Sequence, residues 1–312
     1  MCAPSNGHVT LLNPWPLTLH LDPSFFLHAR SATLDLMTQS ALVCGRCQAQ
    51  ALPEATFCHN CGSVLTPFSG ESPASGAPWT LTDICKAIGL VVLVLIVSSI
   101  PASIVALVIA GGREIEQDPT ALTVTLAASA FLELALLFTA VHFSVRKYHL
   151  PWASLGLRRP TRGGFWLTLG LAVGLVIAGL IVSFAYFEAL SAVGIDPETD
   201  IEQAFQSVGP LVVLIILSLL FAPLLEEIFF RGFVFGGLRD RWGVVLAGLA
   251  SGLLFALAHI GNPGTIYLMP PVAAIGAIFA WGYAYSGSLL ASVLAHFLFN
   301  LAAVIDGITR HS

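Results

Sequence analysis

Two adjacent glutamates and an arginine lie inside an otherwise hydrocarbon stretch of this chain. Glu226 and Glu227 follow a run of leucine, valine and isoleucine residues, and Arg231 comes four residues after Glu227. A charged side chain near the centre of a bilayer costs roughly 2.5–3.5 kcal/mol on insertion scales, and such residues are usually functional. This stretch is therefore the first candidate for an active site.

Helical spacing predicts different roles for the two glutamates. Glu227 and Arg231 are at i,i+4 positions and can form an ion pair on one helix face. Glu226 then points about 100° away, with no partner nearby in sequence. Pro223, one turn earlier, removes a backbone hydrogen bond and can kink the helix. We interpret Glu226 as a candidate base, whereas Glu227 and Arg231 are equally well explained by a catalytic or a purely structural role; among the predicted site residues they are supporting residues for Glu226.

A histidine interrupts the next apolar segment. Phe255 and His259 share one helix face at i,i+4. A lone histidine on an apolar helix is more often a packed core residue than a functional one. If a hairpin turns near Trp242, however, Glu226 and His259 lie at nearly the same height on antiparallel neighbours, because the helical rise is about 1.5 Å per residue. The spacing thus predicts that a carboxylate and an imidazole meet.

The last apolar segment carries a third polar pair. His296 and Asn300 are again at i,i+4, so both side chains can face one cavity. Alone, a His–Asn hydrogen bond can simply join helices. Three polar faces on three segments favour a common site.

These motifs, in this order on separate segments, resemble the CPBP family of membrane proteins. That family includes type II CAAX prenyl endopeptidases, bacteriocin-processing proteins and abortive-infection proteins. The similarity covers roughly residues 120–306. It rests on Glu226-Glu227-x3-Arg231, Phe255-x3-His259, His296-x3-Asn300 and the block Leu155-Gly156-Leu157-Arg158-Arg159-Pro160.

The resemblance implies an intramembrane endopeptidase that acts on a membrane-associated peptide or protein. Glu226 would act as general base on a water, helped by His259. His296 and Asn300 would donate hydrogen bonds to the developing oxyanion. A second version places zinc at Glu226, His259 and His296, with water as the fourth ligand. We favour the metal-free arrangement.

Two other classes of function remain open. One is a non-enzymatic immunity or scaffold protein with the same fold, which would have no need of all four polar residues. The other is a proton-coupled transporter, for which we detect no inverted repeat. No nucleic-acid partner is expected. The remaining polar residues in apolar segments, Glu133, His142 and Glu188, are interpreted as helix-packing or interface groups.

The elements that must position these residues are transmembrane helices. The chain of 312 residues is 56% hydrophobic and only 10% charged, whereas soluble domains are about 25% charged. We expect an all-α polytopic membrane domain over residues 81–306 with about seven spans; six or eight is possible because the fifth and seventh are short. The predicted spans are 84–110, 120–145, 165–190, 209–235, 243–260, 266–285 and 289–305.

Loop charges predict the orientation of these spans. Arg146, Lys147, Arg158, Arg159 and Arg162 cluster between the second and third spans, which favours a cytoplasmic loop and a cytoplasmic N-terminus. The ribbon described next and the family subtype suggest the inner or plasma membrane of a prokaryote.

Four cysteines precede the membrane domain. Cys44-x2-Cys47 and Cys58-x2-Cys61 have the spacing of two zinc knuckles. We predict a structural zinc ribbon over residues 40–65, which is also a candidate protein-binding module; two disulfides are the alternative. Residues 66–80 are predicted to be a flexible linker. Residues 1–36 are expected to be unstructured or to lie upstream of the true start, for which Met37 is the candidate.

Overall fold

A computed structural model describes the ribbon in part and most of the membrane domain. The expected unstructured region 1–36 and most of the expected linker 66–80 lie outside the described residues. The described residues are 42–44, 46–47, 49–51, 55, 57–65, 77–195, 200–260 and 263–311.

Within these residues, six continuous helices are long and apolar enough to cross a membrane. They are Leu81–Ala110, Pro119–Arg146, Phe165–Ala192, Val208–Leu257, Thr265–Ser286 and Leu290–His311. The prediction of an all-α membrane domain is confirmed, and strands among the described residues are confined to the ribbon, as β1 (Leu42–Val43) and β2 (Gln50–Ala51). The fourth segment contains both the fourth and the fifth predicted spans, so these six segments agree with the expectation of about seven spans.

The fourth helix, Val208–Leu257, is a hairpin with two arms. The chain reverses at Gly243, whose φ of 74° is accessible to glycine without a steric cost. The Ser251 hydroxyl donates to the Phe230 carbonyl across the arms at 2.8 Å. The rings of Phe230 and Phe255 also pack at 5.2 Å between centroids. The hairpin predicted near Trp242 is therefore confirmed.

The first arm alternates between two helical geometries. Its segments are α5 (Val208–Ile216), the π-helix η5 (Leu217–Phe221), α6 (Ala222–Glu226) and the π-helix η6 (Glu227–Phe235). The second arm is the part of α7 (Gly236–Leu257) that follows Gly243. Single π turns widen a helix and are frequent at functional sites. Here the boundary between α6 and η6 falls between the two glutamates.

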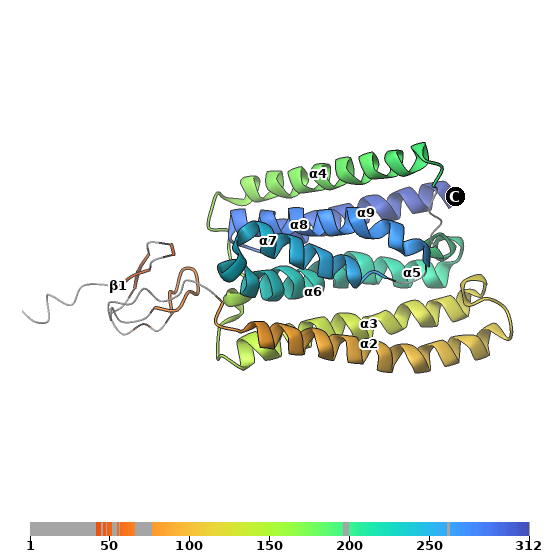
Figure 1. The fold of residues 1–312 in the computed structure, drawn as a ribbon, viewed down its shortest axis with the longest axis horizontal. Helices are drawn as coiled ribbons and strands as arrows, with labels where there is room; N and C mark the ends of the chain where they lie inside the picture. Colours follow the sequence, from red (N-terminus) through yellow and green to blue (C-terminus); the bar gives the residue numbers. More distant parts are fainter. Residues whose placement is uncertain are drawn as a thin grey trace, which may run out of the picture.

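The helices form a bundle with the first arm in its interior. Figure 1 shows the hairpin of α2 (Leu81–Ala110) and α3 (Pro119–Val141) along one edge and α4 (Phe165–Ala192) along the opposite edge. The hairpin arms, α8 (Met269–Ser286) and α9 (Leu290–His311) lie between them. Glu226 at the end of α6 and His296 on α9 are both buried in this bundle.

Glycines allow α7 and α8 to touch. A Cβ atom on Gly276 would lie 2.7 Å from the Gly252 Cα atom, which is closer than real carbon atoms approach. Small residues at helix contacts are a common basis of packing in membranes, where backbones must approach closely to gain dispersion energy. This contact fixes the height at which Phe255 and His259 are held.

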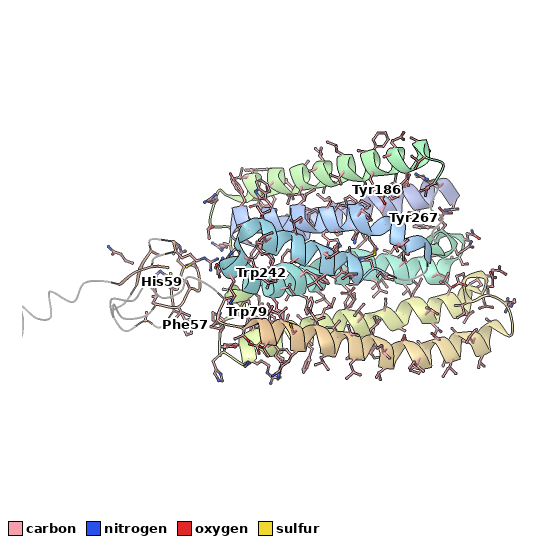
Figure 2. The ribbon with its side chains drawn as sticks, in the orientation of Figure 1. Phe57, His59, Trp79, Tyr186, Trp242 and Tyr267 are labelled. Carbon is pink, nitrogen blue, oxygen red and sulfur yellow. The ribbon has the colours of Figure 1, made fainter. Side chains whose placement is uncertain are left out.

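The ribbon lies next to one end of the bundle. Figure 2 shows Trp79 and Trp242 at this end and Tyr186 and Tyr267 toward the other. Trp79 is 1% exposed, and its indole N–H donates to the Phe233 carbonyl at 2.9 Å. The backbone N–H of Ala77 also donates to an Asp240 carboxylate oxygen. The last residues of the expected linker are thus packed against the bundle.

Candidate active site

One cavity brings together the four predicted catalytic side chains. Its volume is about 460 Å³ and its wall is mainly apolar. Glu226 reaches it from the end of α6, His259 from just beyond α7, and His296 and Asn300 from α9. The remaining lining residues are Leu126, Ser129, Phe205, Leu214, Leu217, Ser218, Ala222, Phe255, Val272, Ile275, Phe279, Phe299, Ala303 and Val304.

Glu227 is the centre of a buried charged cluster behind this cavity. Its Oε1 atom lies 2.8 Å from Arg231 Nη1 and 3.1 Å from His296 Nδ1. Glu227 and Arg231 are both completely buried. The predicted i,i+4 ion pair is present, but the contact between Glu227 and His296 was not predicted. It links the first motif to the third.

The contact with Glu227 determines how His296 can act. A carboxylate accepts hydrogen bonds, so the Nδ1–H group of His296 donates to it. The other ring nitrogen, Nε2, lies 3.8 Å from Glu226 Oε2. His296 therefore bridges the two glutamates, and the imidazole nearest to Glu226 is His296.

Arg231 is held by aromatic rings as well as by Glu227. Its guanidinium lies 4.3 Å from the centroid of the Phe255 ring and 5.5 Å from that of Phe279. Its Nη2 atom also donates to the Gly276 carbonyl at 3.3 Å. Cation–π contacts gain strength when they are desolvated. The phenylalanine of the second motif thus packs against the arginine of the first.

His259 occupies a more open position than the sequence predicts. It is exposed, and its Nδ1 lies 2.8 Å from the carbonyl of Phe255. Because a carbonyl can only accept, Nδ1–H is the donor and the neutral ring keeps a lone pair on Nε2. The contacts of the described residues include none between His259 and Glu226. The two line the same cavity without touching.

Asn300 is oriented by a backbone group that Pro223 leaves unpaired. The N–H group of Ala222 bonds to the Leu217 carbonyl, which is the i→i+5 pattern of a π-helix. In that pattern, residue 223 would donate to the Ser218 carbonyl, but proline has no N–H group. The Asn300 side-chain amide donates to this carbonyl instead, at 2.8 Å. Because Pro223 cannot donate a backbone hydrogen bond, the Ser218 carbonyl is free to accept one from Asn300, and this bond positions the Asn300 side chain.

Sequence reasoning missed one residue of the site. Glu133 of α3 is only 8% exposed, and its carboxyl group is within hydrogen-bonding reach of Glu226. From its sequence position we interpret Glu133 as a helix-packing or interface group. An isolated carboxylate in a predicted span was the available signal, since ionisable residues inside membranes usually face a partner or a cavity.

The ribbon cysteines fit a metal site. Cys44, Cys47, Cys58 and Cys61 are all free thiols. Their Sγ atoms lie within 4.8 Å of one another, which is close enough for the four to bind one metal ion. A tetrahedral zinc with bonds of about 2.3 Å requires similar separations. No other group of three or more ligand atoms in the described part of the chain meets this distance. The ligand atoms of Glu226, His259 and His296 therefore do not all lie within this distance of one another.

Charge also favours a cation at the ribbon. Burial opposes ionisation of Cys44, but hydrogen bonds from Ser63 and from backbone N–H groups lower its pKa to about 6. Burial raises the pKa of Cys61 to about 12. Without a cation, the cluster would hold both thiolates and thiols near neutral pH. A bound metal ion deprotonates its thiol ligands.

Comparison with known proteins agrees with the motifs. Residues 208–302 match the family model of Rce1-like type II CAAX prenyl endopeptidases. The resemblance to this family is confirmed. All six predicted site residues lie within residues 208–302, the part of the chain that matches this family model, whereas Glu133 lies outside it. No solved structure matches the chain significantly.

Two bacterial proteins that are similar to this chain are named as membrane peptidases. YdiL of Bacillus subtilis, provisionally named a membrane peptidase, is 30% identical over 141 residues, or 45% of this chain and 54% of YdiL. MroQ of Staphylococcus aureus, named a membrane-embedded CAAX protease, is 27% identical over 166 residues, or 51% of this chain and 59% of MroQ. The chain thus matches little more than half the length of either relative.

Proposed function

We propose that this chain is an intramembrane endopeptidase in which Glu226 activates a water molecule. The observation that carries the proposal is that Glu226, His259, His296 and Asn300 line one largely apolar cavity. A carboxylate that lines such a cavity can take a proton from a water molecule held within hydrogen-bonding distance. The substrate would be a peptide or small protein of the membrane, because a cavity enclosed by spanning helices favours an apolar chain.

The reaction would begin with the attack of water on a substrate carbonyl carbon. Glu226 takes a proton from the water as its oxygen bonds to carbon. The carbonyl oxygen becomes negative and accepts hydrogen bonds from Asn300 and from the protonated ring of His296. Glu227 compensates the charge of that ring. Glu226 then returns the proton to the leaving nitrogen as the carbon–nitrogen bond breaks.

His259 would act at the cavity mouth. Its Nδ1–H group is held by the Phe255 carbonyl, so Nε2 is available to accept a proton or to orient the attacking water. We further propose that the ribbon end of the bundle faces the cytoplasm, since the basic residues of the 146–162 and 239–241 segments lie near the ribbon end.

The test compares membranes from cells that produce the wild-type chain with membranes from cells that produce Glu226→Gln. New protein N-termini that depend on the wild-type chain identify its cleavage products, which purified protein in detergent should then reproduce on the matching peptides. Glu226→Gln should reduce cleavage by roughly 10²–10⁴-fold, the usual contribution of a general base.

Glu188→Gln is the matched control, because this substitution also removes a carboxylate from a spanning helix but at an exposed position of α4. It should leave the products unchanged. Identical N-termini in the wild-type and Glu226→Gln membranes would contradict the proposal and favour a non-enzymatic protein. Solute uptake that depends on Glu226, without new N-termini, would favour a transporter.

Zinc analysis of the full chain separates the metal-free mechanism from the metal-dependent one. The ribbon should bind one zinc ion, and Cys58→Ser should abolish this binding while peptide cleavage continues. A second zinc ion that remains in Cys58→Ser and is lost with His259→Ala would contradict the metal-free mechanism.

A further inference from the structure

A second carboxyl group lies against the proposed base. Glu133 belongs to α3, which packs against both α6 and η6. The side chains of Glu133 and Glu226 are each 8% exposed and are within hydrogen-bonding reach of each other. The Oε2 atom of each is buried with no hydrogen-bond partner. The mechanism proposed above gives Glu133 no role.

Two touching carboxyl groups in an apolar interior cannot both be ionised. The repulsion between like charges and the cost of burying each charge favour a pair that shares one proton. A shared proton gives a charge-assisted hydrogen bond, which is shorter and stronger than a neutral one. One member of the pair is then a carboxylate, as the mechanism requires of Glu226.

The charged groups around Glu226 leave this role to Glu133. The Nε2 atom of His296 on α9 lies 3.8 Å from Glu226 Oε2, which is longer than a hydrogen bond. Arg231 is paired with Glu227 at 2.8 Å. His259 lines the same cavity, but the contacts of the described residues include none between it and Glu226. Glu133 is therefore the neighbour that can donate a hydrogen bond from outside the cavity.

We propose that Glu133 is a positioning residue that donates a hydrogen bond from its protonated carboxyl group to the Glu226 carboxylate. The bond engages one oxygen of Glu226 and leaves the other directed to the cavity and its water. This inference rests on the proposed function, because Glu226 must be the base for its orientation to matter. A leucine at position 133 would satisfy a packing role but not this one.

Infrared spectroscopy of the full chain in lipid nanodiscs tests the shared proton without a substrate. At neutral pH the wild-type protein should show the carbonyl stretch of a buried protonated carboxyl group, which shifts in deuterated water and disappears at alkaline pH. Glu133→Gln should remove this band, whereas Glu188→Gln should retain it. A wild-type spectrum without the band, or an unchanged band in Glu133→Gln, would overturn the proposal.

Kinetics then test the positioning role on a peptide identified from the cleavage products. Glu133→Leu, which has no donor, should lower kcat roughly 10–100-fold with little change in KM, as expected for a lost hydrogen bond to a charged group. Glu133→Gln keeps an N–H donor and should restore kcat to within a few-fold of wild type. It should also remove any alkaline decline of kcat that arises when the pair loses its shared proton.

The two proposals fail in different ways. If Glu226→Gln still cleaves at the wild-type rate, the proposed function is wrong. If Glu226→Gln is inactive while Glu133→Leu keeps the wild-type kcat and pH profile, only the role of Glu133 is wrong.

Discussion

At the scale of single residues, Glu227 has more partners than its ion pair with Arg231 suggests. Its Oε1 atom contacts both Arg231 and His296 and thereby connects the helix that bears the proposed base, Glu226, to the helix that bears the proposed oxyanion donors. Because all of these groups are buried, each compensates a charge or a polar group that water cannot reach. The cluster is therefore as important to stability as to chemistry.

Arg231→Met should destabilise the protein by about 3–5 kcal/mol, because it leaves the buried carboxylate of Glu227 without its cation. Thermal unfolding in detergent measures the effect. Arg310 provides the matched control, since it also forms an i,i+4 ion pair, with Asp306, but both side chains are more than half exposed. Arg310→Met should cost no more than about 0.5 kcal/mol. Equal losses for the two variants would contradict a buried role for Arg231.

Some contacts of the site follow from sequence spacing and others do not. The pair of Glu227 and Arg231 is local, so an i,i+4 spacing predicts it. The contacts of His296 with Glu227 and of Glu133 with Glu226 join residues on separate helices. Their formation depends on the rotation of each helix about its axis, which an apolar segment with little periodicity leaves undetermined.

At the scale of elements, the wide turns of the first arm create polar positions that a regular helix lacks. The carbonyls of Ser218, Phe230 and Phe233 each accept a side-chain donor from another part of the chain. The sequence predicts an irregularity at Pro223 but not the π geometry or these partners. Hydropathy is insensitive to both, since it averages over whole turns.

The link between Pro223 and Asn300 can be measured with a double-mutant cycle. Asn300→Ala should cost about 1–3 kcal/mol, because it leaves the Ser218 carbonyl buried without a donor. Pro223→Ala restores a backbone N–H that can bond to this carbonyl. In the Pro223→Ala background, Asn300→Ala should therefore cost clearly less. Additive losses in thermal unfolding would mean that the proline does not govern this contact.

The glycine contact between α7 and α8 gives a second test at this scale. In Gly252→Ala, the new methyl group would meet the Ala273 carbonyl and lie 2.8 Å from the Ala277 nitrogen. The helices must separate, which would move Phe255 away from Arg231. We expect a loss of about 1–3 kcal/mol, typical of overpacking, together with reduced cleavage.

Gly248→Ala is the control for the glycine contact, since its methyl group would approach Ala280 no closer than 3.8 Å. It should change neither thermal unfolding nor cleavage. Wild-type behaviour of Gly252→Ala as well would show that the two helices can separate without harm to the site.

At the scale of the whole molecule, Arg158 connects the ribbon to the turn that precedes α9, the helix that carries His296 and Asn300. Arg158 donates to the Cys61 carbonyl at 3.0 Å and to the Gly287 carbonyl at 2.7 Å. Gly287 lies in the turn between α8 and α9, and α9 carries His296 and Asn300. The spacing of the cysteines predicts the ribbon itself. Its docking depends on the loop after η2 (His142–Arg146), which sequence spacing cannot place.

Hydrogen exchange can test whether Arg158 couples the ribbon to this turn. Arg158→Gln should raise the exchange rates of residues 57–65 and 286–289 roughly tenfold, as expected for the loss of about 1.4 kcal/mol of charge-assisted hydrogen bonding. Arg159→Gln removes the same charge from an exposed neighbour and should change neither segment. The zinc content should stay constant in both variants, because neither arginine is a ligand. Faster exchange in the ribbon alone would mean that Arg158 holds the ribbon but does not stabilise the turn leading to His296.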